Sequence, residues 1–155
     1  MGLSRTIFFA GIDRTVLTLW VGGLWISGYL VAPTLFSMLN DRQLAGLLAG
    51  QIFQSMNYIG LFAGGYLLVS TLVRAGNNSF RQWRIWVLIS MLILIIIAAF
   101  VIQPMMQELK TQGISEGTIQ AKEFGRLHGL SSILFLINSI LGLLLVITGL
   151  DQEKG

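Results

Sequence analysis

Long uncharged stretches alternate with short polar ones along the chain and divide it into four apolar runs. These runs comprise residues 15–38, 52–73, 85–105 and 129–150. A helix needs about 20 apolar residues to cross the hydrocarbon core of a bilayer, and each run meets that length. The pattern therefore predicts an all-α fold, an integral membrane four-helix bundle that forms one domain over residues 1–155.

The second helix is predicted to be longer than a bilayer is thick. Asn40 and Gln43 have the spacing of a capping box, so this helix is expected to begin at Asp41. The uncharged sequence then continues to Val73, which is too far for one straight span. We expect the helix to project beyond the bilayer at its start or to bend at Gly50.

The remaining polar segments predict further helix ends. Residues 1–14, which include Asp13, are expected to form a short arm on the membrane surface. Gly76 is expected to end the second helix, and Ser79 to cap the third. Ser115 can begin the fourth helix, which would then project beyond the bilayer on the same side as the second.

The two prolines stand near the far ends of the first and third runs. Pro33 is expected to interrupt the backbone hydrogen bonds of the first helix, and Pro104 to end the third. Each half of the chain thus has a helix that ends near a proline, a polar stretch and a second helix. This similarity is a weak sign of an internal repeat.

Composition supports a membrane setting. Only 11% of the residues are charged and 54% are hydrophobic, whereas soluble domains carry about 25% charged residues. The basic residues stand singly beside the apolar runs, as membrane anchors do, so we expect the lipid bilayer and no nucleic acid as a partner. With no Cys and one His, the chain lacks the ligands that a zinc site requires, and we expect no metal or cofactor.

The basic residues also predict how the protein sits in its membrane. Four spans place both termini and the turn at residues 74–84 on one side. That side carries Arg5, Arg14, Arg74, Arg81, Arg84 and Lys154, and the other carries Arg42, Lys110, Lys122 and Arg126. Because basic residues are in excess on the cytoplasmic side, we expect both termini to be cytoplasmic and His128 to lie on the outer side.

Polar residues within the apolar runs gather near that outer edge. Separations of three and four residues place those of the second run on one helix face. We predict a ligand-binding group composed of His128, Gln51, Gln54, Asn57, Gln103, Ser131 and Ser132. The alternative for the amides is hydrogen bonding between neighbouring helices, with no ligand.

His128 is the one histidine of the chain and stands at the start of the last apolar run. In the first turn of a helix the dipole favours the neutral imidazole, which can bind a ligand or accept a proton. Alternatively, the ring caps the helix or bonds to Ser132 and has only a structural role. No carboxylate is obviously placed to orient the imidazole, and there is no nucleophile elbow or phosphate loop, so we predict no catalytic residue.

Glycines recur at spacings that let helices approach closely. The predicted packing positions are Gly46, Gly50, Gly60, Gly64 and Gly142. These positions favour a non-enzymatic role, as a small scaffold or accessory protein that packs against a second copy of itself or another membrane protein. The alternative is a small transport or ligand-binding bundle with a polar outer vestibule around His128.

The segment Phe124-x3-His128-Gly129-Leu130-Ser131-Ser132 resembles the signature of the transmembrane protein 205-like family, small four-helix membrane proteins of unknown function that occur in bacteria. The matching positions across the chain are Pro33, Phe36, Gly46, Phe53, Pro104, His128, Gly129 and Ser131. In that pattern an Asn often follows a few residues into the last helix, where this chain has Phe135. The resemblance implies four spans and a home in the bacterial inner (plasma) membrane, and it implies no catalytic residue.

Overall fold

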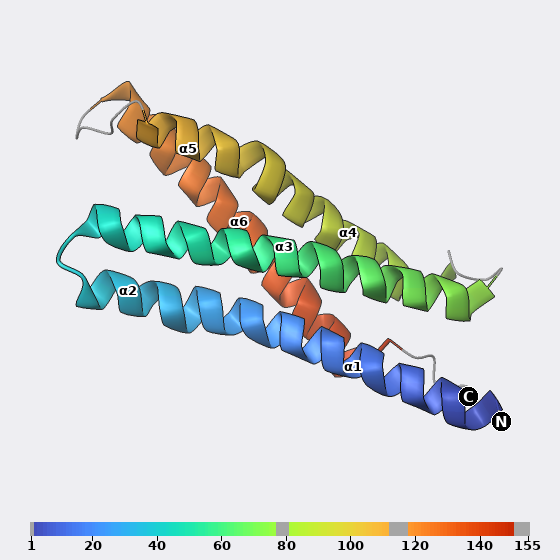
Figure 1. Cartoon of the computed structure of the whole chain (residues 1–155). Coiled ribbons are helices and arrows are strands. Elements are labelled where there is room, and N and C mark those ends of the chain that lie inside the picture. The colour runs from blue at the N-terminus through green and yellow to red at the C-terminus, as the bar shows by residue number, and fades with distance from the viewer. Residues whose placement is uncertain (1, 77–80, 112–117, 151–155) are drawn as a thin grey trace.

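The computed structural model describes residues 2–76, 81–111 and 118–150. No strand occurs among them, and their helices form four long units (Figure 1). The units are α1 (Gly2–Ile26) with the π-helical turn η1 (Ser27–Val31) and α2 (Ala32–Met38); α3 (Arg42–Ala75); α4 (Trp83–Ile97) with the π-helical turn η3 (Ala98–Ile102) and α5 (Gln103–Thr111); and α6 (Ile119–Thr148). All four are long and apolar enough to cross a membrane. The prediction of an all-α, four-helix membrane protein is confirmed.

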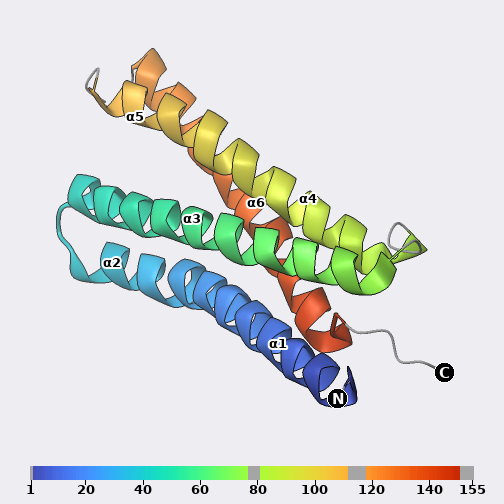
Figure 2. The ribbon, with the colours of Figure 1, turned by 45° about the vertical axis from the view of Figure 1, so that its right-hand side comes forward.

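Each unit of the bundle lies beside two others (Figures 1 and 2). Helix α1 contacts α3 and α6, and α4 contacts the same two helices. The end of the molecule where α1 begins and α3 ends is here called the arginine end, after Arg14, Arg74, Arg81 and Arg84. At the opposite end, here called the His128 end, the contacting pairs α2–α3 and α5–α6 diverge from each other (Figure 1).

Both prolines lie inside continuous helical units. The residue before each proline donates its N–H to a carbonyl at the start of a π turn, that of Ser27 ahead of Pro33 and that of Ala98 ahead of Pro104. Proline lacks an N–H, and its ring crowds the carbonyl one turn back, so the wider π turn relieves the conflict without ending the helix. The prediction that Pro104 ends the third helix is therefore wrong, because α5 continues to Thr111.

Helix α3 begins one residue later than predicted. Asp41, not Asn40, is its cap, and the carboxylate Oδ1 accepts the N–H groups of Gln43 at 2.8 Å and Leu44 at 3.1 Å. A carboxylate there satisfies free N–H groups and is favoured by the helix dipole. The helix runs through Gly50 without interruption for 34 residues. At about 1.5 Å per residue it is about 51 Å long, which exceeds the about 30 Å of the hydrocarbon core.

Other helix ends follow the same capping chemistry. Gly76 ends α3 as predicted, with a φ of 57° that a residue with a side chain rarely adopts. Thr118 caps α6, because its Oγ1 accepts the N–H of Ala121 at 3.2 Å. Ser79 and Ser115, which the sequence suggests as caps, lie outside the described residues.

The indole of Trp20 occupies the centre of the core, where it packs against two glycines of α3. A Cβ atom added to Gly60 would lie 2.9 Å from Trp20 Nε1, and one added to Gly64 would lie 3.0 Å from Cη2 of the same ring. On α6, a Cβ atom added to Gly142 would lie 2.8 Å from Val21. These three of the predicted packing glycines therefore face helices of their own chain.

Similar glycine contacts occur in the two halves of the chain. Gly64 lies against Trp20 of α1 and Leu92 of α4. The corresponding residues of the other half are Gly142, Met91 of α4 and Val21 of α1. Trp20 and Met91 are as far apart in the sequence as Val21 and Leu92, and as the two prolines. Both halves begin at the arginine end, and these contacts agree with the internal repeat that the sequence suggests.

The expected surface arm at residues 1–14 is wrong, because α1 is continuous and Asp13 faces the core. The Asp13 side chain is 1% exposed. Its Oδ2 accepts a hydrogen bond from Ser70 Oγ at 2.8 Å and forms an ion pair with Arg74. Asp13 precedes buried Leu17 by one helical turn, so it lies on the stripe of α1 that packs against α3.

A polar contact at the corresponding place joins the helices of the second half. Arg84 occupies the position in α4 that Asp13 occupies in α1. Its Nη2 donates to the carbonyl oxygen of Thr148 at 3.3 Å, which joins the start of α4 to the end of α6. The guanidinium also lies 5.4 Å from the centroid of the Trp83 ring. Both helix pairs are thus fastened by polar groups at the arginine end.

We predict that Gly64→Val destabilises the bundle, whereas Gly65→Val does not. An added Cβ at Gly64 meets Leu92 at 2.9 Å and Trp20 at 3.0 Å, but one at Gly65 meets nothing within 4 Å. The difference should be about 1–3 kcal/mol, as for other overpacked cores. Reversible unfolding in mixed micelles, followed by tryptophan fluorescence, measures it. Equal stabilities of the two variants would contradict the packing described.

We also predict that Asp13 and Arg74 are energetically coupled. Asp13→Ala should cost about 2 kcal/mol, less than the roughly 3–5 kcal/mol of a fully buried pair, because the Arg74 side chain is 24% exposed. A double-mutant cycle with Arg74→Ala, measured by the same unfolding, gives the coupling. Additive effects of the two substitutions would show that the ion pair contributes nothing.

Candidate functional site

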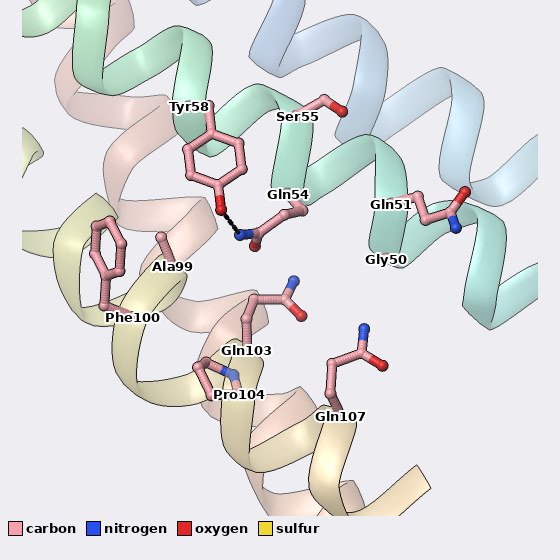
Figure 3. A pocket seen from close by; sticks show the side chains of 10 residues that line it. All are labelled: Gly50, Gln51, Gln54, Ser55, Tyr58, Ala99, Phe100, Gln103, Pro104 and Gln107. Carbon is pink, nitrogen blue, oxygen red and sulfur yellow. Dashed lines mark hydrogen bonds between the residues drawn. The ribbon is translucent and has the colours of Figure 1, made fainter. Parts of the chain in front are cut away.

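An open groove lies where the two helix pairs diverge, between α3 and the η3–α5 segment (Figure 3). Its volume is about 590 Å³. It is lined by Gly50, Gln51, Gln54, Ser55, Tyr58, Ala99, Phe100, Gln103, Pro104 and Gln107. Because side-chain amides dominate its polar lining, we call it the amide groove.

Helical spacing explains how these side chains come together. On α3, Gln51, Gln54 and Tyr58 follow one another at intervals of one turn and share a face. On α5, Gln103 and Gln107 do the same, and Gln107 reaches the groove because this helix continues past the proline. Two polar stripes from different helices thus face one space.

The polar groups of the groove are only partly paired. Gln54 Nε2 donates to Tyr58 Oη at 2.9 Å. Gln54 Oε1 is buried and accepts no hydrogen bond from any described residue. Figure 3 shows Gln54 and Gln103 extending into the groove from opposite walls. Asp13 Oδ1, Trp20 Nε1, Arg84 Nε and Asn138 Oδ1 are also buried without a partner among the described residues, but of this set only Gln54 lines the groove.

The ammonium group of Lys110 lies at the His128 end of the groove. This side chain extends from α5, and its Nζ lies 3.6 Å from the position that a Cβ atom would take on Gly50. The same Nζ lies 5.7 Å from the centroid of the Phe124 ring of α6. Gly50 therefore gives room to the ammonium. Gly46, the remaining predicted packing glycine, faces Phe36 at 3.8 Å.

The two π turns have different surroundings. Gly28 and Tyr29 of η1 precede Ala99 and Phe100 of η3 by the same number of residues as Pro33 precedes Pro104. A Cβ atom on Gly28 would overlap the ring of Phe135, and the centroid of that ring also lies 6.0 Å from the centroid of Tyr29. Aromatic rings therefore pack closely against η1, whereas an open groove lies beside η3.

The structure brings together some of the predicted ligand-binding residues and separates others. Gln51, Gln54 and Gln103 line the groove. Asn57 is partly buried on α3 but does not line it. His128, Ser131 and Ser132 belong to α6 and do not line it either.

His128 is exposed and lies against its own helix. Its ring stacks on Phe124, with 6.3 Å between centroids and 8° between planes. Ser132 Oγ donates to the backbone carbonyl of His128 at 2.9 Å and not to the imidazole. The histidine and the groove amides thus do not form one vestibule.

The sequence analysis does not predict Gln107, Ser55 or Lys110 as part of this region. A helix that ends at Pro104 would exclude Gln107, although the spacing between Gln103 and Gln107 places both side chains on one helix face. Among the described residues, no cluster of three His, Asp or Glu side chains could hold a metal ion. The groove instead offers neutral donors and acceptors with one cation beside them.

Comparisons with known proteins add the family. No curated protein and no solved structure matches the chain. A family model matches residues 15–115, a segment that contains every residue of the amide groove and ends before His128. The chain belongs to the family described as Domain of unknown function (DUF4149).

Proposed function

We propose that this protein is a membrane-embedded binding protein that takes an amphiphilic molecule from the bilayer into the amide groove. The observation that carries the proposal is the Gln54 side chain, which lines the open groove and whose buried oxygen has no hydrogen-bond partner in the described part of the chain. Polar groups in membrane helices are expensive unless paired, and they mark functional sites. A bound ligand that exchanges hydrogen bonds with this amide would complete its pairing.

The chemistry and size of the groove suit such a ligand. Amide side chains both donate and accept hydrogen bonds, so Gln51, Gln54 and Gln103 can hold hydroxyl, ester or phosphate groups. Phe100 and the ring of Tyr58 offer apolar surface for a hydrocarbon chain. The volume of about 590 Å³ falls within the roughly 300–1,000 Å³ of small-molecule sites.

This proposal fits the packing better than a scaffold role does. The scaffold interpretation rests on glycine faces that are free for a partner, yet Gly60, Gly64 and Gly142 contact Trp20 and Val21 of the same chain. The groove lining contains no charged acid or base, so in this proposal the protein binds and does not catalyse.

We further propose a bacterial inner membrane as the location, with the arginine end in the cytoplasm. The clustering of Arg74, Arg81 and Arg84 around one turn supports that orientation. The family match is compatible with the resemblance to the transmembrane protein 205-like family, and we propose that the chain is one of its members.

We predict that Gln54→Leu and Gln103→Leu each reduce retained lipid about fivefold, because one hydrogen bond is worth about 1 kcal/mol. Asn57→Leu is the matched control, since it removes an amide from the same helix outside the groove. The protein is purified in mild detergent, washed with lipid-free detergent, and its bound phospholipid is quantified by mass spectrometry. Wild type without bound lipid, or groove variants that retain as much as Asn57→Leu, would refute the proposal.

His128→Ala should leave lipid retention unchanged and alter stability by less than about 0.5 kcal/mol, as for other exposed positions. The reason is that the ring is exposed and contacts Phe124 of its own helix. The same purification and an unfolding curve test both statements. A marked loss of bound lipid in this variant would show that His128 takes part in lipid binding.

A further inference from the structure

The chemistry of the amide groove changes in a fixed order along its length. From the His128 end inward, α3 presents Gly50 and Gln51, then Gln54, then Tyr58. The opposite wall presents Gln107, then Gln103, then Phe100, so its order is the same. Both walls therefore pass from amides near the helix ends to aromatic rings deeper in the bundle.

Lys110 adds a positive charge at the outer end of that series. It follows Gln107 by one helical turn, and its Nζ lies 3.6 Å from the Cβ position of Gly50. The Phe124 ring, with 5.7 Å between its centroid and Nζ, holds the ammonium there by a cation–π contact. Within the described ranges, no carboxylate forms an ion pair with this lysine.

The sequence of groups matches one class of molecule. A glycerophospholipid has a phosphate at one end, then glycerol and ester oxygens, then acyl chains. Resting on the function proposed above, we propose that the groove binds an anionic phospholipid from the bilayer. Its phosphate lies beside Lys110, and an acyl chain lies along Tyr58 and Phe100. Its ester oxygens accept hydrogen bonds from the amide N–H groups of Gln54 and Gln103, and the Gln54 amide turns over so that its oxygen accepts from the Tyr58 hydroxyl. The helix pairs diverge at this end of the bundle (Figure 1), and the groove between α3 and the η3–α5 segment is open.

The charge of Lys110 gives the proposal its specificity. A zwitterionic lipid brings its own cation next to the phosphate, which the lysine repels, whereas an anionic headgroup leaves the phosphate free for a charge-assisted hydrogen bond. Lys110 should therefore determine which phospholipid binds more tightly, whereas the amides should contribute equally to the affinity for every phospholipid.

The test uses the full chain in detergent with mixed micelles that contain equal amounts of dioleoylphosphatidylglycerol and dioleoylphosphatidylcholine. Native mass spectrometry gives the ratio of the two bound lipids. We expect wild type to favour phosphatidylglycerol and Lys110→Gln to reduce that preference about tenfold, the size of one charge-assisted hydrogen bond. Lys110→Arg keeps the charge and should keep the preference. Lys122→Gln, which removes an exposed basic residue of α6, should not change it.

The outcomes separate this inference from the proposed function. If Gln54→Leu loses both lipids but wild type and Lys110→Gln bind them in the same ratio, the anionic headgroup is refuted and the binding function stands. If Lys110→Arg behaves like Lys110→Gln, the charge of the side chain does not select the lipid and the inference falls.

Further arms identify other occupants. If neither amide nor lysine variants change retention of either lipid, both proposals fail together. Displacement of bound lipid by glycerol phosphate would show that the site takes a water-soluble phosphate ester and not a bilayer lipid. A dimer in the native spectrum that excludes lipid would show that a second copy of the chain fills the groove. The wild-type ratio is informative even where a variant fails to fold.

Discussion

A chain inside hydrocarbon must satisfy its backbone hydrogen bonds within itself, and the arrangement of the site depends on that constraint. A helix therefore cannot simply stop at a proline in the membrane, as it can in water. Here a π turn precedes each of Pro33 and Pro104, and both helices continue beyond the proline. The continuation beyond Pro104 adds Gln107 to the groove wall next to Gln103 and places Lys110 one turn further on. A helix that ended at Pro104 would leave the groove without Gln107 and without a neighbouring cation.

Comparing the two halves of the chain shows which packing features they share and which occur in one half alone. Both halves use a bulky residue against a helix glycine, Trp20 with Gly64 in one and Met91 with Gly142 in the other. Both also have a π turn at the same place. The surroundings of the two turns differ, because Phe135 packs against η1 whereas an open groove with amides lies beside η3. The difference lies in side-chain chemistry and not in the backbone plan.

Hydropathy alone was enough to predict the four helices, because crossing a bilayer needs length and apolarity, which are local properties. It could not predict that Asp13 is buried, since its partners Ser70 and Arg74 lie far away in the sequence. The sequence predicts one group of the α3 amides, Gln103 and His128 because polar residues are rare in such runs. It could not predict that the amides line one groove while His128 stacks on Phe124 of its own helix, because rarity does not say which way a side chain faces.

A buried amide oxygen without a donor lowers the stability of a membrane protein, and an apolar residue at Gln54 would remove that penalty. Apolar packing is available elsewhere in the same bundle, where the ring of Phe135 packs on Gly28. Natural sequences break local rules of this kind mainly where function demands it. We therefore propose that the amides along both walls of the groove serve a ligand that completes their hydrogen bonds.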